Sequence, residues 1–274
     1  MLGRQADTWC IQDGKIDFDF INKNYKCVII GGAGLLVLAG GKFERFWQKV
    51  LEKCQIPIFI WGVGTDRVDS LNESYKDVVE QVAKRSELVN VRDELTANAF
   101  RLKDCDISAC PTIAYLEDFR QRNSKLAAQD SLKVNFIYYQ PQIFNEDEIK
   151  RIGSLISQRS SKAIFNSNYQ YSYRGLEDVI QGFYLKSNLV VTTMLHGAIT
   201  AYGLGIPYIA IGKTDKIKAF HARFGNGLIV ESAEEIGTVL DPSIFSKISL
   251  KPVEIEPVYQ FGQRARKRID EICG

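Results

Sequence analysis

The chain has 274 residues, of which 45% are hydrophobic and 25% charged, and its formal net charge is +2. This is the composition of an average globular protein, which excludes a disordered chain and a coiled coil. The nearly balanced charge gives no reason to expect a nucleic-acid partner. The six cysteines are scattered without a C-x-x-C pair, which indicates reduced thiols rather than a disulfide framework or a zinc site.

No apolar run approaches the roughly 20 residues that cross a bilayer, and the first ten residues lack a signal-peptide pattern. We therefore expect a cytoplasmic protein. Four basic residues crowd into the last predicted helix, namely Arg264, Arg266, Lys267 and Arg268. Such a cluster could touch an anionic substrate or the inner membrane surface, and a solvated helix face explains it as well.

From Tyr25 onward, short apolar runs alternate with amphipathic ones, which is typical of βαβ units and a parallel sheet. The predicted strands are 27–30, 56–61, 88–91, 106–109, 132–138, 163–166, 189–192, 207–211 and 227–230. The predicted helices are 42–53, 72–86, 94–102, 146–158, 176–186, 196–203, 217–224, 233–240 and 258–272. The pattern predicts the α/β class with Rossmann-like domains.

A polar stretch with little periodicity, Phe119 to Lys125, lies near the middle of the chain. We interpret it as a linker because a new apolar run begins soon after it. The sequence then divides into a Rossmann-like domain over residues 1–124 and a second one over residues 125–274. The final helix of the second domain could return to the first.

Two glycine-rich turns follow the first two predicted strands. Their candidate ligand-binding residues are Gly31, Gly32, Gly34, Gly62, Gly64 and Thr65. Glycines there let the backbone approach a ligand, and the N–H groups of the two loops could together cradle a phosphate or carboxylate. A tight structural turn would also select glycine. The spacing is not that of the dinucleotide-binding fingerprint.

Arg92 follows the third predicted strand, and Asp93 beside it can cap the next helix. Arginine reads a carboxylate or phosphate through two parallel hydrogen bonds, which favours anion binding. The structural alternative is a surface ion pair between Arg92 and Asp93, which stabilises little.

His196 lies where the buried strand 189–192 gives way to an Ala/Gly-rich helix. In open α/β sheets, ligands bind at the carboxyl ends of the strands, where a helix N-terminus offers N–H groups to an anion. An imidazole at this position could donate or accept a proton near neutral pH. The alternative interpretation is a core histidine whose hydrogen bonds are satisfied by the protein.

Three lysines, Lys213, Lys216 and Lys218, follow the next strand and could hold a phosphate or be solvated. His221, the other histidine, is more consistent with a structural role. The aromatic run from Tyr169 to Arg174 could stack on a sugar ring or pack against the sheet.

Several of these motifs occur in a fixed order. They are Gly31-Gly32-Ala33-Gly34-Leu35-Leu36, Gly62-Val63-Gly64-Thr65, Val91-Arg92-Asp93, Met194-Leu195-His196-Gly197, Gly205-Ile206-Pro207 and Lys216. Taken together they resemble the polysaccharide pyruvyl transferase family, from about Tyr25 to Gly225. The order of the motifs is more specific than any one of them.

The resemblance implies two Rossmann-like domains in a GT-B-like arrangement. It also implies an enzyme that transfers the enolpyruvyl unit of phosphoenolpyruvate onto a saccharide or lipid-linked glycan, giving a pyruvate ketal in bacterial exopolysaccharide, capsule or cell-wall glycan. Arg92, Leu195 and His196 match the phosphoenolpyruvate-binding positions of the family, and His196 is the catalytic candidate. Phosphoenolpyruvate is then a donor substrate, with no cofactor and no metal expected.

Two departures from the family pattern are visible. Met194 stands where the family usually has an arginine, so that Lys213 or Lys216 would have to substitute for it. An earlier strand with a Gly-Asn-x-Gly-Asp-type loop is absent before Gly31, so the first domain is either shortened or closed differently. The alternatives are a GT-B-like glycosyltransferase that uses a nucleotide sugar, and a non-catalytic relative that binds a glycan.

Overall fold

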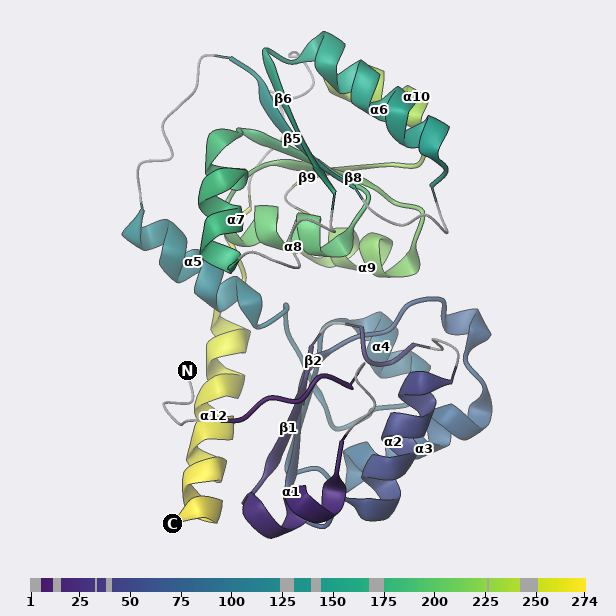
Figure 1. Ribbon diagram of the computed structural model, residues 1–274, viewed down its shortest axis with the longest axis vertical. Coiled ribbons are helices and arrows are strands. Elements are labelled where there is room, and N and C mark those ends of the chain that lie inside the picture. Colours follow the sequence, from purple (N-terminus) through teal and green to yellow (C-terminus); the bar gives the residue numbers. More distant parts are fainter. Residues whose placement is uncertain are drawn as a thin grey trace. The chain divides into compact units, whose positions relative to one another are not determined.

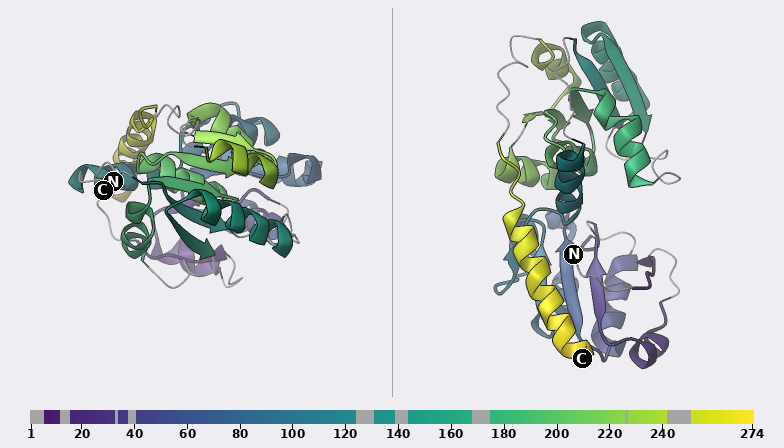
Figure 2. Two further views of the ribbon diagram at one scale, coloured as in Figure 1. Left: turned by 90° about the horizontal axis from the view of Figure 1, so that it is seen from above. Right: turned by 90° about the vertical axis from the view of Figure 1, so that its left-hand side faces the viewer.

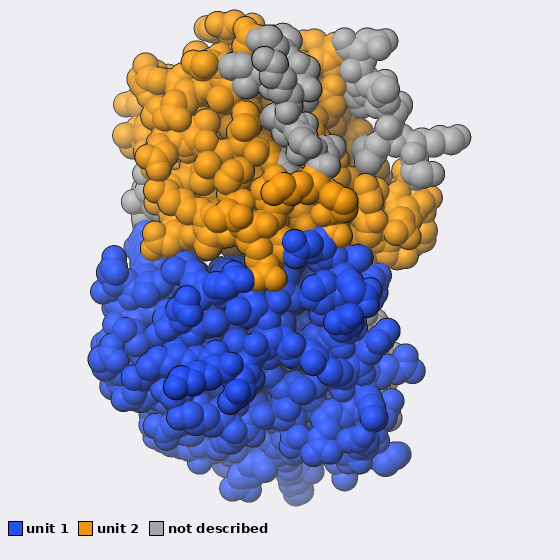
Figure 3. Space-filling view, turned by 180° about the vertical axis from the view of Figure 1, so that it is seen from behind, with its two compact units in different colours: residues 1–111, 254–274 blue, residues 112–253 orange. Residues whose placement is uncertain are grey.

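The computed structural model describes residues 6–11, 16–32, 34–37, 41–123, 131–138, 144–167, 175–225, 227–241 and 251–274 (Figure 1). The chain divides into two compact units (Figure 3). Unit 1 contains residues 1–111 and 254–274, and unit 2 contains residues 112–253.

Unit 1 is built on four parallel strands in the order β1-β2-β3-β4. The strands are β1 (Val28–Gly31), β2 (Ile58–Val63), β3 (Leu88–Val91) and β4 (Asp106–Ile107). The helices are α1 (Phe18–Asn24), α2 (Lys42–Lys53), η2 (Val68–Ser70), α3 (Glu73–Lys84), α4 (Glu94–Ala99) and α12 (Glu256–Cys273). Spatial order follows chain order because each crossover moves one strand further from β1.

Helices cover the two faces of this sheet unequally. On one face, α2 and α3 bury Trp47, Val79 and neighbouring side chains against alternate strand residues such as Ile60. On the other face, α12 packs Phe261 and its neighbours against Phe59 (Figure 2). Successive strand residues point to opposite faces, so this alternation is what a two-sided sheet requires.

Unit 2 is built on five parallel strands in the order β6-β5-β7-β8-β9. The strands are β5 (Lys133–Tyr138), β6 (Lys162–Ser167), β7 (Leu189–Thr192), β8 (Tyr208–Ile211) and β9 (Gly227–Val230). The helices are α5 (Thr112–Arg122), α6 (Glu146–Arg159), α7 (Leu176–Gly182), η4 (Tyr184–Lys186), α8 (Leu195–Gly203), α9 (Asp215–Phe224) and α10 (Ala233–Val239).

The strand order of unit 2 reverses between β5 and β7. From β5 the chain proceeds to β6 on one side, whereas from β7 it proceeds to β8 and β9 on the other. Helices α6 and α10 cover one face with Ile152, Ile156 and Ile236, and α8 packs next to β7 and β8 (Figure 1). A reversal of this kind marks the position at which doubly wound sheets bind ligands, at the carboxyl ends of the two strands.

The predicted strands are all present within two residues of their predicted limits. The linker prediction for Phe119 to Lys125 was wrong in its first part, because Phe119 to Arg122 form the last turn of α5, while Ser124 and Lys125 lie outside the described residues. Buried Ile113, Leu116 and Phe119 hold this helix beside α8 despite its polar end. The division of the chain therefore falls before α5 instead of after residue 124, and α12 belongs to unit 1.

Candidate active site

His196 occupies an unusual position in unit 2. It lies in the first turn of α8, directly after β7, whose four residues are all buried. Eight of the nine residues of α8 are buried, and His196 is the exposed one. A polar side chain on a buried apolar helix is favoured only where the helix reaches the surface. The N-terminal end of α8 therefore exposes the imidazole of His196 to solvent.

The turn between β7 and α8 is closed by tight local contacts. The Thr192 Oγ1 accepts a hydrogen bond from the Met194 N–H at 2.9 Å and donates to the Met194 carbonyl at 3.0 Å. A Cβ atom at Gly197 would lie 2.2 Å from Thr192 Oγ1, so only glycine lets the helix approach the strand this closely. These contacts fix the position of His196 relative to the end of β7.

The N-terminus of α8 has no side-chain cap. Its N-cap residue is Met194, whose thioether side chain is 8% exposed and makes no capping hydrogen bond. Leu195, the first helical residue, is buried. The positive end of the helix dipole therefore lies beside His196, where an anion would be favoured.

The lysines after β8 have different surroundings. Lys213 pairs with Glu148 and lies 4.6 Å from the centre of the Phe144 ring, and Lys218 pairs with Glu231 at 2.9 Å. Lys216 is half-buried in the first turn of α9. Of the three, Lys213 and Lys218 are held by carboxylates of their own unit.

His221 has a structural environment. Its Nδ1 lies 3.4 Å from the Tyr208 hydroxyl, and its ring meets the Tyr208 ring edge-on. Burial, together with the charge of Lys251, lowers the pKa of His221 below its ordinary value. The imidazole is therefore neutral at pH 7, which is consistent with the structural role predicted for it.

Two buried polar side chains of unit 2 were missed by the sequence analysis. Both amide atoms of Asn135 on β5, and Oγ1 of Thr214 just before α9, are buried without a hydrogen-bond partner in the described part of the chain. Asn135 pairs in register with Val190 of β7, so it lies on the strand next to the reversal. The visible signals were an asparagine inside an apolar strand and a threonine at a helix start.

In unit 1 the first glycine loop is open. Gly32 has a φ of +111°, which favours glycine, and a Cβ atom added to Gly32 or Gly34 would meet nothing within 4 Å. Gly31, Gly32 and Gly34 are all exposed. Since no described residue lies near these two positions, the backbone of this loop can be approached closely by a ligand.

The second glycine loop is closed by protein. The N–H groups of Gly62 and Thr65 donate to Asn90 Oδ1 at 3.1 Å and Thr96 Oγ1 at 3.0 Å. Gly62 has a φ of +66° and lies against Pro111, where a Cβ atom would approach the ring to 2.4 Å. These donors are not free, which corrects the expectation that both loops form one floor of available N–H groups.

Arg92 is buried beside this loop. Its side chain is 2% exposed, its Nε donates to Asp93 Oδ2 at 2.8 Å, and its Nη2 donates to the Thr65 carbonyl at 3.2 Å. Asp93 also caps α4 by accepting from the Thr96 N–H at 2.9 Å. The two residues form a buried ion pair instead of the weak surface pair considered from the sequence.

Gly64 explains how the guanidinium is accommodated. A Cβ atom at this position would lie 2.4 Å from both Cζ and Nη2 of Arg92, so the arginine packs directly on the glycine backbone. The second loop is also linked to the first, since Thr65 Oγ1 donates to the Leu36 carbonyl and the Leu36 N–H donates to the Gly64 carbonyl at 3.3 Å. The second loop, on which Arg92 packs, is thus itself attached to the first loop.

The structure offers no metal centre in its described residues, which hold no group of three or more His, Cys, Asp or Glu side chains able to ligate an ion. The aromatic run from Tyr169 to Arg174 and the loop residue Ala33 lie outside the described residues.

Comparison with known families decides the affiliation. The model of the polysaccharide pyruvyl transferase family matches residues 5–213, which span most of the chain and include both glycine loops, Arg92 and His196. The protein belongs to the polysaccharide pyruvyl transferase family. The predicted resemblance is therefore confirmed. A search of curated protein sequences found no match.

Solved structures show what this family member resembles in fold. A putative UDP-N-acetylglucosamine 2-epimerase from Listeria monocytogenes has a TM-score of 0.60 at 10% identity, over 95% of this chain and 78% of that chain. UDP-GlcNAc 2-epimerases from Methanocaldococcus jannaschii, with UDP-GlcNAc and UDP, and from Neisseria meningitidis, with UDP-GlcNAc, have TM-scores of 0.58 and 0.56. Their identities are 13% and 16%, and they cover 93% and 95% of this chain and 78% and 79% of those chains. The predicted class, two Rossmann-like parallel-sheet domains with GT-B-like neighbours, is confirmed.

As a pyruvyl transferase family member, the chain departs from the family pattern at Met194. The structure buries this side chain at the N-cap of α8, where an arginine would have to reach out past Leu195. Lys213, one of the two residues predicted to replace the missing arginine, already pairs with Glu148. Lys216 stays a candidate for that role.

Proposed function

We propose that this protein transfers the enolpyruvyl unit of phosphoenolpyruvate to a saccharide, forming a cyclic pyruvate ketal. Membership of the polysaccharide pyruvyl transferase family supports the reaction class. The observation that carries the proposal is the exposed imidazole of His196 on an otherwise buried helix. Catalytic groups are typically presented in this way, at the carboxyl end of a strand beside a reversal of strand order.

The proposed reaction needs a proton donor, a base and partners for two anionic groups. Protonation of the methylene carbon of phosphoenolpyruvate gives an oxocarbenium-like centre at the adjacent carbon, which a sugar hydroxyl attacks. Phosphate then departs, and a second hydroxyl of the sugar closes the ring. His196 can supply or accept the proton, since imidazole changes its charge near neutral pH.

The anionic groups of the donor need positive or N–H partners. In unit 2 the uncapped N-terminus of α8 provides such a partner beside His196. The open loop of Gly31, Gly32 and Gly34 in unit 1 is a separate candidate for binding an anion through backbone N–H groups. Arg92 is the residue that the family resemblance assigns to anion binding, and in the structure its guanidinium is buried and paired with Asp93.

The proposed partners are phosphoenolpyruvate and a saccharide or lipid-linked glycan acceptor, with no further cofactor. Exopolysaccharide, capsule or cell-wall glycan synthesis and a cytoplasmic location stay predictions. Peripheral contact with the inner membrane surface also stays a prediction. No described helix of the structure has the length and apolar character needed to cross a membrane.

The proposal is tested by ligand-induced stabilisation together with turnover. Phosphoenolpyruvate at 100 times its dissociation constant should raise the free energy of unfolding by about 2.7 kcal/mol, which a melting curve detects. Phosphate release that depends on an added saccharide is the activity readout. His196→Gln should abolish phosphate release, because glutamine can hydrogen-bond but cannot exchange a proton near pH 7.

His221→Gln is the matched control, because it makes the same change at the other histidine of the same unit. It should keep saccharide-dependent phosphate release. Stabilisation by UDP-GlcNAc but not by phosphoenolpyruvate would replace the proposal with a nucleotide-sugar transferase, the ligand class bound by two of the structural neighbours. Stabilisation by neither compound would favour a non-catalytic relative.

A further inference from the structure

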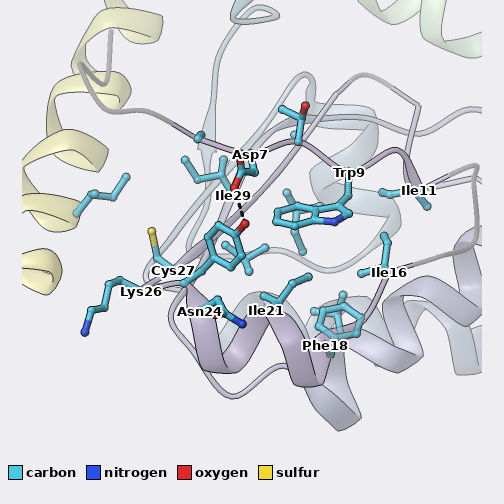
Figure 4. A pocket seen from close by; sticks show the side chains of 18 of the residues that line it. Asp7, Trp9, Ile11, Ile16, Phe18, Ile21, Asn24, Lys26, Cys27 and Ile29 are labelled. Carbon is cyan, nitrogen blue, oxygen red and sulfur yellow. Dashed lines mark hydrogen bonds between the residues drawn. The ribbon is translucent and has the colours of Figure 1, made fainter.

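An apolar pocket of about 720 Å³ lies in unit 1, and its lining includes Gly31 of the first glycine loop but no residue of the second loop and not Arg92. Strand β1 forms its floor, α1, α2 and α12 contribute walls, and residues 6–11 pass over it (Figure 4). Its lining includes Trp9, Ile11, Ile16, Phe18, Ile21 and Ile29. A volume of this size is within the range of pockets that hold small molecules.

On the α12 side the pocket is open because α12 covers only part of its face of the sheet. The buried contacts of α12 are with Phe59 on β2, and Trp61 and Leu88 pack at the same cluster. Ile29 on the neighbouring edge strand β1 points to this face but is 38% exposed. Parallel sheets are normally covered on both faces, so an apolar residue of β1 is left for another occupant.

Exposed apolar side chains gather at this pocket. Of the five large hydrophobic residues that are exposed in the described part of the chain, Trp9 and Ile29 line the pocket, and Phe20 packs on Tyr25, which also lines it. Trp9 lies edge-on to Tyr25 at 5.0 Å between ring centres. Clusters of exposed apolar residues mark interaction sites, and tryptophan is favoured where a hydrocarbon region meets water.

The charged groups around the pocket favour an anion. Lys26 lines the pocket and points away from its rings (Figure 4), and Lys23 lies in the last turn of α1. Both lysines are exposed. The nearby carboxylate of Asp7 accepts a hydrogen bond from the Tyr25 hydroxyl, and this hydrogen bond raises the pKa of the Tyr25 phenol.

Helix α12 adds one further cation on the same side. Arg266 does not itself line the pocket, but it stands three residues before Ile269, which does, so it lies within one turn of the pocket along α12. Its nearest carboxylate is Asp270 at 3.9 Å, which is a weak pair. Arg264 and Arg268, in contrast, are turned to Asp106 and Glu87 at the other side of the helix.

We propose that this pocket takes the hydrocarbon chain of an anionic membrane lipid, whose head group lies at Lys26 and Arg266. The pocket is concave and bounded by β1, three helices and residues 6–11, which suits a flexible chain better than the flat face of a second copy of this protein. The exposed Trp9, Phe20 and Ile29 would enter the interfacial layer beside it. This inference does not depend on the proposed transfer reaction.

The test is co-sedimentation of the protein with vesicles of dioleoyl phosphatidylglycerol, with dioleoyl phosphatidylcholine vesicles for comparison. The double variant Trp9→Ser/Ile29→Ser should weaken partitioning about tenfold or more, the factor that corresponds to 1.4 kcal/mol. Leu176→Ser is the matched control, because Leu176 is 41% exposed and lies in unit 2. It should partition like the unaltered protein.

A second pair of variants tests the charge. Lys26→Gln should weaken binding to phosphatidylglycerol vesicles by about fivefold, the effect expected for one lysine near an anionic surface, and should not affect phosphatidylcholine. Lys103→Gln, at an exposed position just before β4 on the opposite edge of the sheet from β1, should have no effect. Brominated acyl chains should quench Trp9 fluorescence in the unaltered protein, which shows that a chain enters the pocket.

Three results would overturn the inference. One is the absence of sedimentation with phosphatidylglycerol vesicles. Another is equal weakening by Leu176→Ser and by the Trp9→Ser/Ile29→Ser variant. The third is a dimer that Ile29→Ser dissociates while vesicles fail to bind, because the occupant is then a second copy of the chain. Circular dichroism melting curves identify any variant that has lost its fold, and Ile29→Val replaces Ile29→Ser if that occurs.

Discussion

Substitution of Gly64 by alanine tests the arrangement of Arg92 directly. The added Cβ atom would lie 2.4 Å from Cζ and Nη2 of Arg92, well inside van der Waals contact. The guanidinium has little freedom to retreat, since it is buried and bonded to Asp93 and the Thr65 carbonyl. Either the loop shifts or the buried ion pair lengthens.

The expected cost follows from these two routes. Forcing an extra methyl group into a packed interior costs roughly 1–3 kcal/mol, and breaking a buried ion pair costs roughly 3–5 kcal/mol. The protein will take the cheaper route, so Gly64→Ala should lower the free energy of unfolding by about 1–3 kcal/mol. In an Arg92→Ala background the obstacle is gone, and Gly64→Ala should then cost less than about 0.5 kcal/mol.

Urea unfolding followed by tryptophan fluorescence measures this effect, because the three tryptophans, at positions 9, 47 and 61, all belong to unit 1. Gly34→Ala is the matched control, because a Cβ atom there meets nothing within 4 Å. It should change the free energy of unfolding by no more than about 0.5 kcal/mol. Equal effects of Gly64→Ala and Gly34→Ala would refute the close packing of Arg92 on Gly64.

Three further perturbations have defined outcomes. Gly197→Ala should lower the free energy of unfolding of unit 2 by about 1–3 kcal/mol, because the added Cβ atom would lie 2.2 Å from Thr192 Oγ1. Asp93→Asn should lower the free energy of unfolding of unit 1 by about 3 kcal/mol, since it leaves a buried guanidinium uncompensated. Acidification should destabilise unit 2 through His221, because its pKa is lower in the folded than in the unfolded protein, so the unfolded chain binds the proton more tightly. The contribution of the neutral imidazole to the free energy of unfolding is present above pH 6.5, the ordinary pKa, and is lost as the pH falls below it.

Each of these has its own control. Gly182→Ala adds a Cβ atom to open space in unit 2, so a loss equal to that of Gly197→Ala would contradict the steric argument. Asp118→Asn removes an exposed ion pair with Arg122 and should cost about 0.5 kcal/mol or less. His221→Phe should flatten the acid dependence of circular dichroism melting between pH 7.5 and 5.5, and an unchanged slope would contradict the role assigned to burial.

The strands could be predicted from sequence because each is a short apolar run that ends in glycine or a polar residue. Two helices of the described residues, α1 and α5, were not predicted from the sequence, although both carry local signals. Asp17 caps α1, where it accepts from the Asp19 and Phe20 N–H groups. The spacing of Ile113, Leu116 and Phe119 in α5 was visible as well, but its charged last turn made it look like a linker.

The environment of Arg92 could not be predicted from its neighbours in sequence. The choice between a weak surface pair and a buried pair depends on Gly64, which strand pairing brings alongside through the register of β2 and β3. The acceptors of the Gly62 and Thr65 N–H groups lie 28 and 31 residues further along the chain. No local pattern reports such contacts, since they arise only when the sheet forms.

The two glycine loops show why residue type alone does not separate binding from packing. Both follow parallel strands and both contain a glycine with positive φ, at Gly32 and Gly62. Around Gly62 and Gly64 the absent side chains make room for Pro111 and Arg92, whereas around Gly32 and Gly34 a Cβ atom would meet no protein atom within 4 Å. A glycine whose missing side chain is replaced by protein is explained by the fold. Gly34, in contrast, has neither a positive φ nor a neighbour that requires glycine, so the first loop is where ligand binding by the backbone of unit 1 should be sought.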